Sequence, residues 1–167
     1  AASSDYPLRD VYKRQGRAFR CKWPNDVLAV DGTAAVKVAG LLLEGAGDGW
    51  VVVGIGVDVA HAPPPGETLH VARALAAFGW TEGVAPVLAA FAARSALWLE
   101  IWRAQGLPPV RDAWLGRVHG LGGPILVRLA DETLSGRFAA LDDDGALVLD
   151  LGPAGTRRIL AGDVFFP

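Results

Sequence analysis

The stretch VLAVDGTAAVKVAGLLLE, residues 27–44, decides the fold. It holds two runs of apolar residues around Asp31-Gly32, a dipeptide that is a strong hairpin signal between strands. The two runs are therefore predicted to be antiparallel strands. A third run, WVVVGIGVDV (50–59), is rich in β-branched residues, which indicates a central strand buried on both faces. The N-terminal half thus predicts an antiparallel meander.

Helices are expected after this sheet. TLHVARALAAFG (68–79) is predicted to form a helix, with Thr68 as its N-cap and Gly79 as the residue that ends it. Residues 84–105 give a stronger helix prediction, and residues 110–118 a short one. In the long helix an apolar stripe follows i, i+3, i+4 spacing. Its members are Val87, Leu88, Phe91, Ser95, Trp98 and Trp102.

The chain changes character near residue 121. Short apolar runs at about ten-residue spacing, with turns between them, predict a small β-barrel. They are ILVRL (125–129), TLSGRF (133–138), ALVLDL (146–151) and RRIL (157–160). The sequence therefore predicts an α+β chain in three parts. These parts are a non-native or disordered N-terminal segment over residues 1–18, a sheet-and-helix domain over 19–120, and a barrel over 121–167.

Composition excludes several classes of function. The 167 residues are 51% hydrophobic and 20% charged, with a net charge of −2 and no basic run, so we expect no nucleic-acid binding. Cys21 is the only cysteine, which excludes an intrachain disulfide and favours a reducing cytoplasm. Apolar stretches are interrupted well short of ~18 residues, so no membrane span is expected. The three histidines lack metal-ligand spacing, and no metal site is predicted.

Lys37 is the first candidate functional residue. It interrupts an otherwise apolar strand, and strand alternation predicts that it shares a face with Ala35, Ala39 and Leu41. An ammonium group on such a face needs an anion, and a phosphate or carboxylate ligand would supply one. Alternatively, Lys37 extends from an edge strand into solvent. Gly40 beside it leaves room for a ligand against the backbone.

Two further motifs accompany Lys37. KWPND (22–26) combines a cation, an aromatic ring, an amide and a carboxylate at one turn. Pro24 restricts Trp23 to extended conformations. Gly54 and Gly56 interrupt the run of residues 50–59, which indicates either close approach of another group to the backbone or a β-bulge. They match a dinucleotide-binding fingerprint poorly, because no third glycine opens a helix.

Taken together and in order, KWPNDV, KVAGLLLE and VVVGIGVDV resemble the catalytic domain of the biotin protein ligase family. GRFAALDDDGALVL and AGDVFF resemble the small SH3-like barrel at the C-terminus of that family. The resemblance covers residues 19–167. It implies a mixed or antiparallel sheet with packed helices, of the class II aminoacyl-tRNA-synthetase/biotin-ligase type, incomplete here and followed by the barrel.

The resemblance implies a cytoplasmic ATP-dependent ligase. Biotin and ATP, with Mg²⁺, form biotinyl-5′-AMP, and a lysine of the biotin carboxyl carrier protein of acetyl-CoA carboxylase then takes the biotin. On this basis Lys37 contacts the biotin carboxylate and the α-phosphate, and stabilises developing negative charge. Asn25 positions the α-phosphate or its metal. Asp26 orients or deprotonates the carrier lysine.

The resemblance also implies a wider binding set. It consists of Lys22, Trp23 and Asn25 of KWPND together with Gly40, Gly54, Gly56 and Asp58. Trp23 and Gly40 would shape the pocket, and the other two glycines would let the ligand approach the sheet. Asp58 replaces the asparagine usual in the family, near adenine or ribose. Its carboxylate would either weaken nucleotide affinity or face the ribose hydroxyls.

One family motif does not have its counterpart here. The GRGRxGR loop, normally well upstream of KWPND, is absent from these 167 residues, and Gln15-Gly16-Arg17 echoes it only superficially. A truncated and impaired ligase is therefore expected. The alternatives are a lipoate-ligase-like enzyme and a non-catalytic module that binds a carrier protein. Homodimerisation through an exposed sheet is a further possibility.

Overall fold

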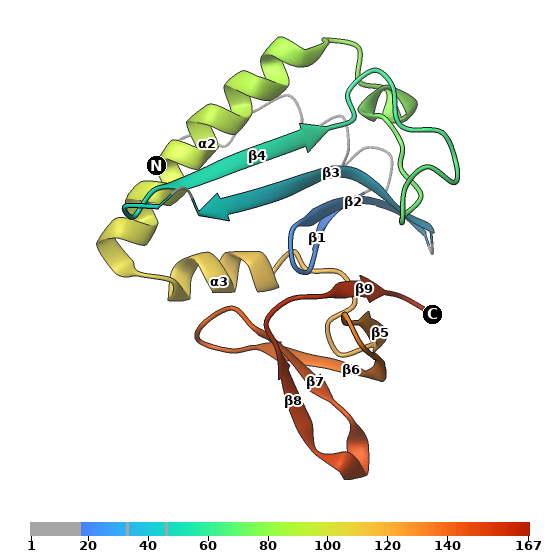
Figure 1. Cartoon of the computed structure of the whole chain (residues 1–167). Helices are drawn as coiled ribbons and strands as arrows, with labels where there is room; N and C mark the ends of the chain where they lie inside the picture. Colours follow the sequence, from blue (N-terminus) through green and yellow to red (C-terminus); the bar gives the residue numbers. More distant parts are fainter. Residues whose placement is uncertain (1–17, 33, 46) are drawn as a thin grey trace. The chain divides into compact units, whose positions relative to one another are not determined.

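The computed structural model describes residues 18–32, 34–45 and 47–167 (Figure 1). These residues form two compact units, which are described separately. The first contains residues 18–20 and 26–86, and the second contains residues 21–25 and 87–167. The non-native or disordered N-terminal segment expected over residues 1–18, including Gln15-Gly16-Arg17, lies outside the described residues except for Ala18.

The first unit is built on the predicted hairpin. Strands β1 (Ala18–Lys22), β2 (Asp26–Asp31), β3 (Ala34–Gly45) and β4 (Val51–Val57) lie in the order β1-β2-β3-β4. Strand β2 runs antiparallel to β3, with Asp31 opposite Ala34. Gly32 has a φ of +60°, a conformation that suits glycine in a tight turn. The hairpin prediction is therefore confirmed.

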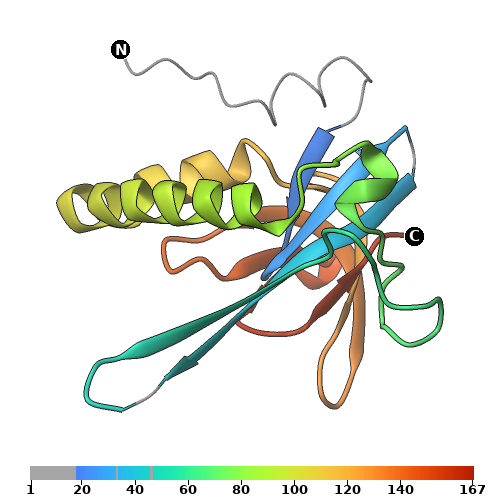
Figure 2. The ribbon, with the colours of Figure 1, turned by 90° about the horizontal axis from the view of Figure 1, so that it is seen from above.

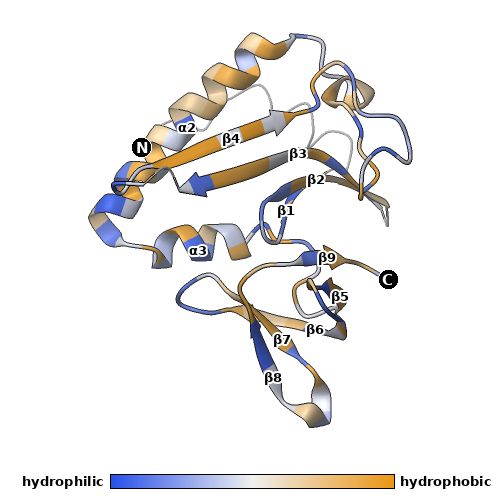
Figure 3. Ribbon diagram, in the orientation of Figure 1, coloured by the Kyte–Doolittle hydropathy of each residue, from blue (hydrophilic) through white to orange (hydrophobic). Residues whose placement is uncertain are grey.

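Strand β4 does not occupy the predicted central position. Among the described residues it pairs only with β3, and its outer half is exposed, with Val51 58% and Val53 50% accessible. Figure 2 shows the ends of β3 and β4 as a long two-stranded ribbon, and Figure 3 shows β4 coloured as hydrophobic. The apolar composition predicted burial on both faces, which is wrong for these residues because no other element in the described part of the chain covers them.

The helix predicted over residues 68–79 is also wrong. Only a 3₁₀ turn, η1 (Leu75–Phe78), forms, and the residues before it run extended beside β3. The Lys37 amide donates to the carbonyl of Val71 at 2.8 Å, and the Arg73 amide donates to the carbonyl of Lys37 at 2.9 Å. These bonds compete with helix formation. Gly79 does end the turn, with a φ of +90°.

The second unit contains the two remaining helices and the barrel strands. Helix α2 (Val84–Gln105) belongs to it from Val87 onward, and α3 (Pro108–Leu115) follows. The barrel strands form one antiparallel sheet in the order β8-β7-β6-β5-β9. Their bounds are β5 (Pro124–Arg128), β6 (Thr133–Leu141), β7 (Leu147–Asp150), β8 (Thr156–Ile159) and β9 (Asp163–Phe165), with a 3₁₀ turn η2 (Gly152–Ala154) before β8. The predicted strands and the α+β class are confirmed.

Helix α2 has the predicted bounds, but no residue of it is buried. Leu88 and Trp102 of the predicted stripe are 64% and 53% exposed. The helix is also long and apolar enough to cross a membrane, although it carries Arg94 and Glu100. The expectation that no apolar stretch reaches this length is therefore wrong. Length and composition alone are weak evidence for a membrane span, because core helices of soluble proteins meet the same criterion.

Candidate anion-binding site

A β-bulge determines where Lys37 points. In the β2–β3 ladder Asp26 lies opposite Gly40, but the register shifts so that Leu28 lies opposite Lys37, leaving Val38 as the extra residue. Directly opposed residues share a face of the sheet. Asp26 and Leu28 share one face by alternation, so their partners Gly40 and Lys37 share it too. The prediction that Lys37 lies with Ala39 and Leu41 is wrong because the bulge reverses the alternation.

Lys37 and Asp26 form an ion pair on this face. The Lys37 Nζ lies 2.5 Å from the Asp26 Oδ1, with the lysine side chain 33% exposed and the aspartate 7% exposed. Residues 71 and 73 form backbone hydrogen bonds with Lys37 along the edge of β3 that faces away from β2. A nearly buried carboxylate therefore fixes the ammonium group of a lysine side chain that is one-third exposed.

Glycines form the surface beside this ion pair. Gly40 lies opposite Gly56, and Leu42 lies opposite Gly54, so all three glycines face the same way as the pair. A Cβ atom on Gly40 would lie 2.9 Å from the Lys37 Nζ and 3.1 Å from the Asp26 Oδ1. A side chain at position 40 would thus force the Lys37 ammonium to shift within the ion pair.

The other two glycines border open space. A Cβ on Gly56 would meet no atom within 4 Å, and one on Gly54 would meet only Leu42, at 3.8 Å. The β3–β4 register is regular, so the bulge predicted as one explanation for these glycines is wrong. Close approach of an external group remains the prediction for both positions.

Asp58 adds a second carboxylate near Lys37. Its amide donates to the Val38 carbonyl at 2.9 Å, and alternation from Gly56 places it on the glycine face. Burial raises the pKa of the Asp58 carboxyl, while the charge of Lys37 opposes that rise. With both acids ionised, Lys37 at +1 and two carboxylates at −1 each give this group a net charge of −1. An anionic ligand would therefore compete with the two carboxylates for Lys37.

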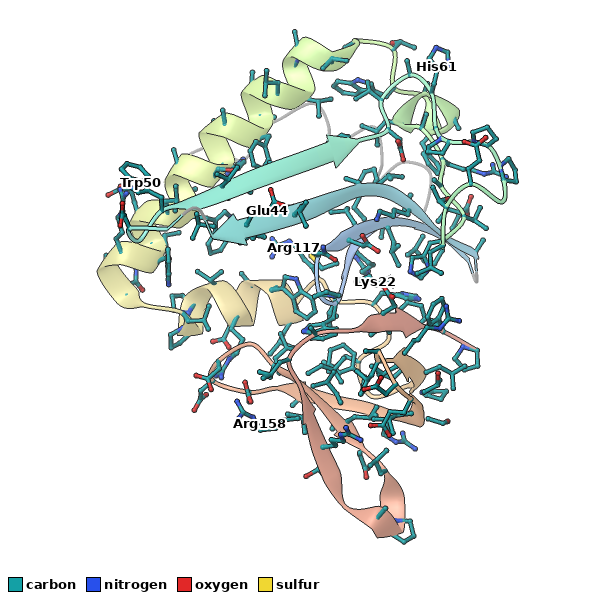
Figure 4. All side chains as sticks on the ribbon, viewed as in Figure 1. Lys22, Glu44, Trp50, His61, Arg117 and Arg158 are labelled. Carbon is teal, nitrogen blue, oxygen red and sulfur yellow. The ribbon has the colours of Figure 1, made fainter. Side chains whose placement is uncertain are left out.

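The first four residues of KWPND belong to the second unit. Trp23 is 4% exposed and is part of the buried barrel cluster, where its Nε1–H donates to the Gly145 carbonyl at 3.2 Å. Lys22 is 3% exposed, and Figure 4 labels it at the end of β1, whereas Asn25 is exposed. The Trp23–Pro24 peptide bond is cis. These contacts assign Trp23 to barrel packing, which the sequence analysis missed because nothing local signals it.

Metal-ligating side chains do not cluster in the part of the chain that the structure describes. No group of three or more histidine, cysteine, aspartate or glutamate residues there could hold a metal ion. The chemistry that the glycine face offers is therefore that of one partly exposed lysine beside two carboxylates and a backbone surface without side chains.

The fold is that of the biotin protein ligases. The chain superposes on a biotin protein ligase from Aquifex aeolicus with a TM-score of 0.75 and 23% identity, covering 94% of this chain and 68% of that one. A structure described as the Aquifex aeolicus ligase in complex with biotin and ATP matches with a TM-score of 0.74, also at 23% identity, covering 94% of this chain and 65% of that one.

Sequence relatives lead to the same class of protein. Residues 120–166 match the family model of the biotin protein ligase C terminal domain. A biotin–[acetyl-CoA-carboxylase] ligase from Paracoccus denitrificans is 42% identical over 153 residues, which are 87% of this chain and 62% of that protein. One from Mycobacterium tuberculosis is 33% identical over 147 residues, 86% of this chain and 51% of that protein. The chain is a homologue of the biotin protein ligases, and it spans about half to six-tenths of these relatives.

Proposed function

We propose that this chain provides the anion-binding sheet and the C-terminal barrel of an ATP-dependent biotin protein ligase. The observation that carries the proposal is the ion pair of Asp26 with Lys37, whose side chain is one-third exposed, beside a face formed by glycines. The named activity of the relatives supports it, since both are biotin–[acetyl-CoA-carboxylase] ligases. The substrates are biotin and ATP, and the acceptor is a lysine of a biotin carboxyl carrier protein in the cytoplasm.

In the first step a biotin carboxylate oxygen attacks the α-phosphorus of ATP. The new O–P bond forms as the bond to the β-phosphate oxygen breaks, and pyrophosphate leaves with that electron pair. Lys37 interacts with the carboxylate and the α-phosphate, whose charge increases in the transition state. A preorganised cation of this kind lowers the barrier by about 3 kcal/mol, or on the order of 10²-fold in rate.

In the second step the carrier lysine amine attacks the acyl carbon of biotinyl-5′-AMP. The C–N bond forms, the C–O bond breaks, and AMP leaves with the electron pair of that bond. Asp26 accepts a hydrogen bond from the incoming amine, which orients the amine and gives its proton a carboxylate partner. The same carboxylate holds Lys37, so Asp26 serves both steps.

Mg²⁺ enters this proposal only with the nucleotide. The described residues contain no cluster of three metal-ligating side chains, and Mg²⁺ commonly binds through substrate phosphates with few protein ligands. When bound, Mg²⁺ would neutralise phosphate charge. Asn25 is exposed and could contribute one oxygen ligand, as the family resemblance implies.

Calorimetric titration with biotinyl-5′-AMP tests the proposal, with lipoyl-AMP as the control ligand. The chain should bind the biotin compound selectively, and Lys37→Met, which keeps most of the aliphatic stem, should abolish binding without unfolding the chain. Arg103→Met is the matched control, because it removes one cation from an exposed ion pair with Glu100. Equal affinity in Lys37→Met and the unaltered chain would contradict the role of Lys37.

A second comparison separates the two steps. Asp26→Asn should slow biotin transfer from preformed adenylate more than it weakens adenylate binding, because the amide cannot take the proton of the amine. Preference for lipoyl-AMP would indicate a lipoate-ligase-like enzyme. Binding of neither compound by a folded chain would refute the ligase proposal for this chain and leave a carrier-binding module as the alternative.

A further inference from the structure

The turn between β6 and β7 has no role in the reaction described above, yet it contacts KWPND. Asp142 organises this turn. Its Oδ1 accepts hydrogen bonds from the amides of Asp144 and Ala146, both at 2.9 Å, and its own amide donates to the Ala146 carbonyl at 3.0 Å. Gly145 has a φ of +83°, which glycine adopts without strain. The turn is thus held by hydrogen bonds within itself, two of them to the Asp142 side chain.

Arg158 on β8, labelled in Figure 4, fixes the turn from outside. Its Nε donates a short hydrogen bond to the Asp142 Oδ2, and its Nη2 donates to the Asp144 Oδ2 at 2.9 Å. The hydrogen bond from Arg158 lowers the pKa of Asp142, so that carboxyl stays ionised to a lower pH than an ordinary aspartate does. The carboxylates at 142 and 144 therefore both bind one guanidinium group.

The carbonyl that this turn presents accepts the indole N–H of Trp23. The ring of Trp23 is buried in the same cluster as Ile125, Phe138 and Leu149. The residue before the pentapeptide is also held within this unit. The Cys21 amide donates to the Arg117 carbonyl at 2.9 Å, and the His119 amide donates to the Cys21 carbonyl at 2.8 Å.

We propose that the turn Asp142–Gly145 is a remote positioning element for residues 22–25 of the KWPND pentapeptide. The turn fixes Trp23 through the Gly145 carbonyl, and Trp23 in turn restrains Lys22, Pro24 and Asn25, which adjoin it in the chain. Because Asn25 leads directly into Asp26, ligand binding by this pentapeptide depends on a turn more than a hundred residues away. The ligand-binding part of this inference rests on the proposed function. The part that concerns how the turn positions residues 22–25 is independent of the proposed function.

The test compares two glycine substitutions in the full chain. Gly145→Ala strains the turn that carries the carbonyl. Gly152→Ala is the matched control, because Gly152 also has a positive φ, +65°, and lies in the next turn of the same barrel, where a Cβ would meet no atom within 4 Å. Both variants should lose similar stability, since both force alanine into a left-handed conformation.

Two readouts distinguish positioning from general destabilisation. Amide hydrogen exchange at residues 21–23 and 25, measured without ligand, should quicken about tenfold in Gly145→Ala relative to Gly152→Ala, as expected for the loss of the Trp23 hydrogen bond and of the packing that it supports. Affinity for biotinyl-5′-AMP should fall about tenfold in the same comparison. Trp23→Phe, which removes the N–H donor and keeps an aromatic ring, should change both readouts in the same direction.

Equal exchange at residues 21–23 and 25 in the two glycine variants would overturn the inference. Faster exchange in Gly145→Ala with unchanged affinity would overturn the link from the turn to ligand binding. If the unaltered chain binds no adenylate, the proposed function fails and the link to ligand binding fails with it. The exchange measurement then still decides whether the turn holds the segment.

Discussion

Substitution of Gly56 by alanine should separate ligand binding from stability. In the structure a Cβ at this position meets no atom within 4 Å, so the change introduces no clash. Alanine in a strand interior is favoured over glycine by ~0.5–1 kcal/mol, because glycine loses more backbone entropy on folding. The free energy of unfolding, measured in urea, should therefore rise slightly or stay unchanged.

Adenylate binding should respond in the opposite direction. If the ligand lies against the backbone at Gly56, the added methyl group occupies its place, and such overpacking costs about 1–3 kcal/mol. That cost corresponds to about a 5- to 150-fold weaker affinity in the calorimetric titration. Gly45→Ala is the control, since Gly45 lies on the opposite face of β3 and also borders open space. Unchanged affinity in Gly56→Ala would refute the assignment of the glycine face as the ligand surface.

Three further substitutions have specific expected outcomes. Gly40→Ala should weaken adenylate binding and, unlike Gly56→Ala, also destabilise the chain in urea, because its Cβ would displace the Lys37 ammonium. Asp58→Asn should tighten binding about tenfold by removing a nearby negative charge. The pKa of Asp58 is raised in the folded chain, so protonated Asp58 stabilises the fold at low pH, and this contribution is lost as the pH rises through the folded-state pKa. Asp58→Asn should therefore be more stable than the unaltered chain at pH 7 but not at pH 3. Asp142→Asn should lose more stability at pH 7 than at pH 3 in the same urea assay, because the lowered pKa reflects a hydrogen bond with Arg158 that is lost on acidification.

Local chemistry made much of the fold predictable. Asp31-Gly32 specifies a tight hairpin, and helix α2 begins and ends at the predicted residues because periodicity and Gly106 act within a few positions. The failed helix at residues 68–79 shows the limit of this approach. Its composition suits a helix, but hydrogen bonds to Lys37 hold residues 71–73 extended, and no local pattern reveals such a partner.

The candidate site was predictable in its residues but not in its geometry. Motif resemblance identified Lys37, Asp26 and the glycines, and the structure brings these together on one face of the sheet. The direction of Lys37 was predicted wrongly because a single extra residue, Val38, reverses strand alternation and leaves no mark in the sequence. The domain boundary near residue 121 stays a prediction, whereas residues 21–25 belong to the same compact unit as the barrel.

The packing of Trp23 has a consequence for the order in which the chain can fold. The tryptophan lies 122 positions before the carbonyl that accepts its hydrogen bond, and it completes a cluster whose other members all follow residue 124. During synthesis the N-terminal half leaves the ribosome first, so Trp23 cannot form its native contacts until the barrel strands have been synthesised. Contacts of such long sequence separation form slowly because they close a large loop. We therefore expect the KWPND segment to be among the last parts of the chain to reach its native structure.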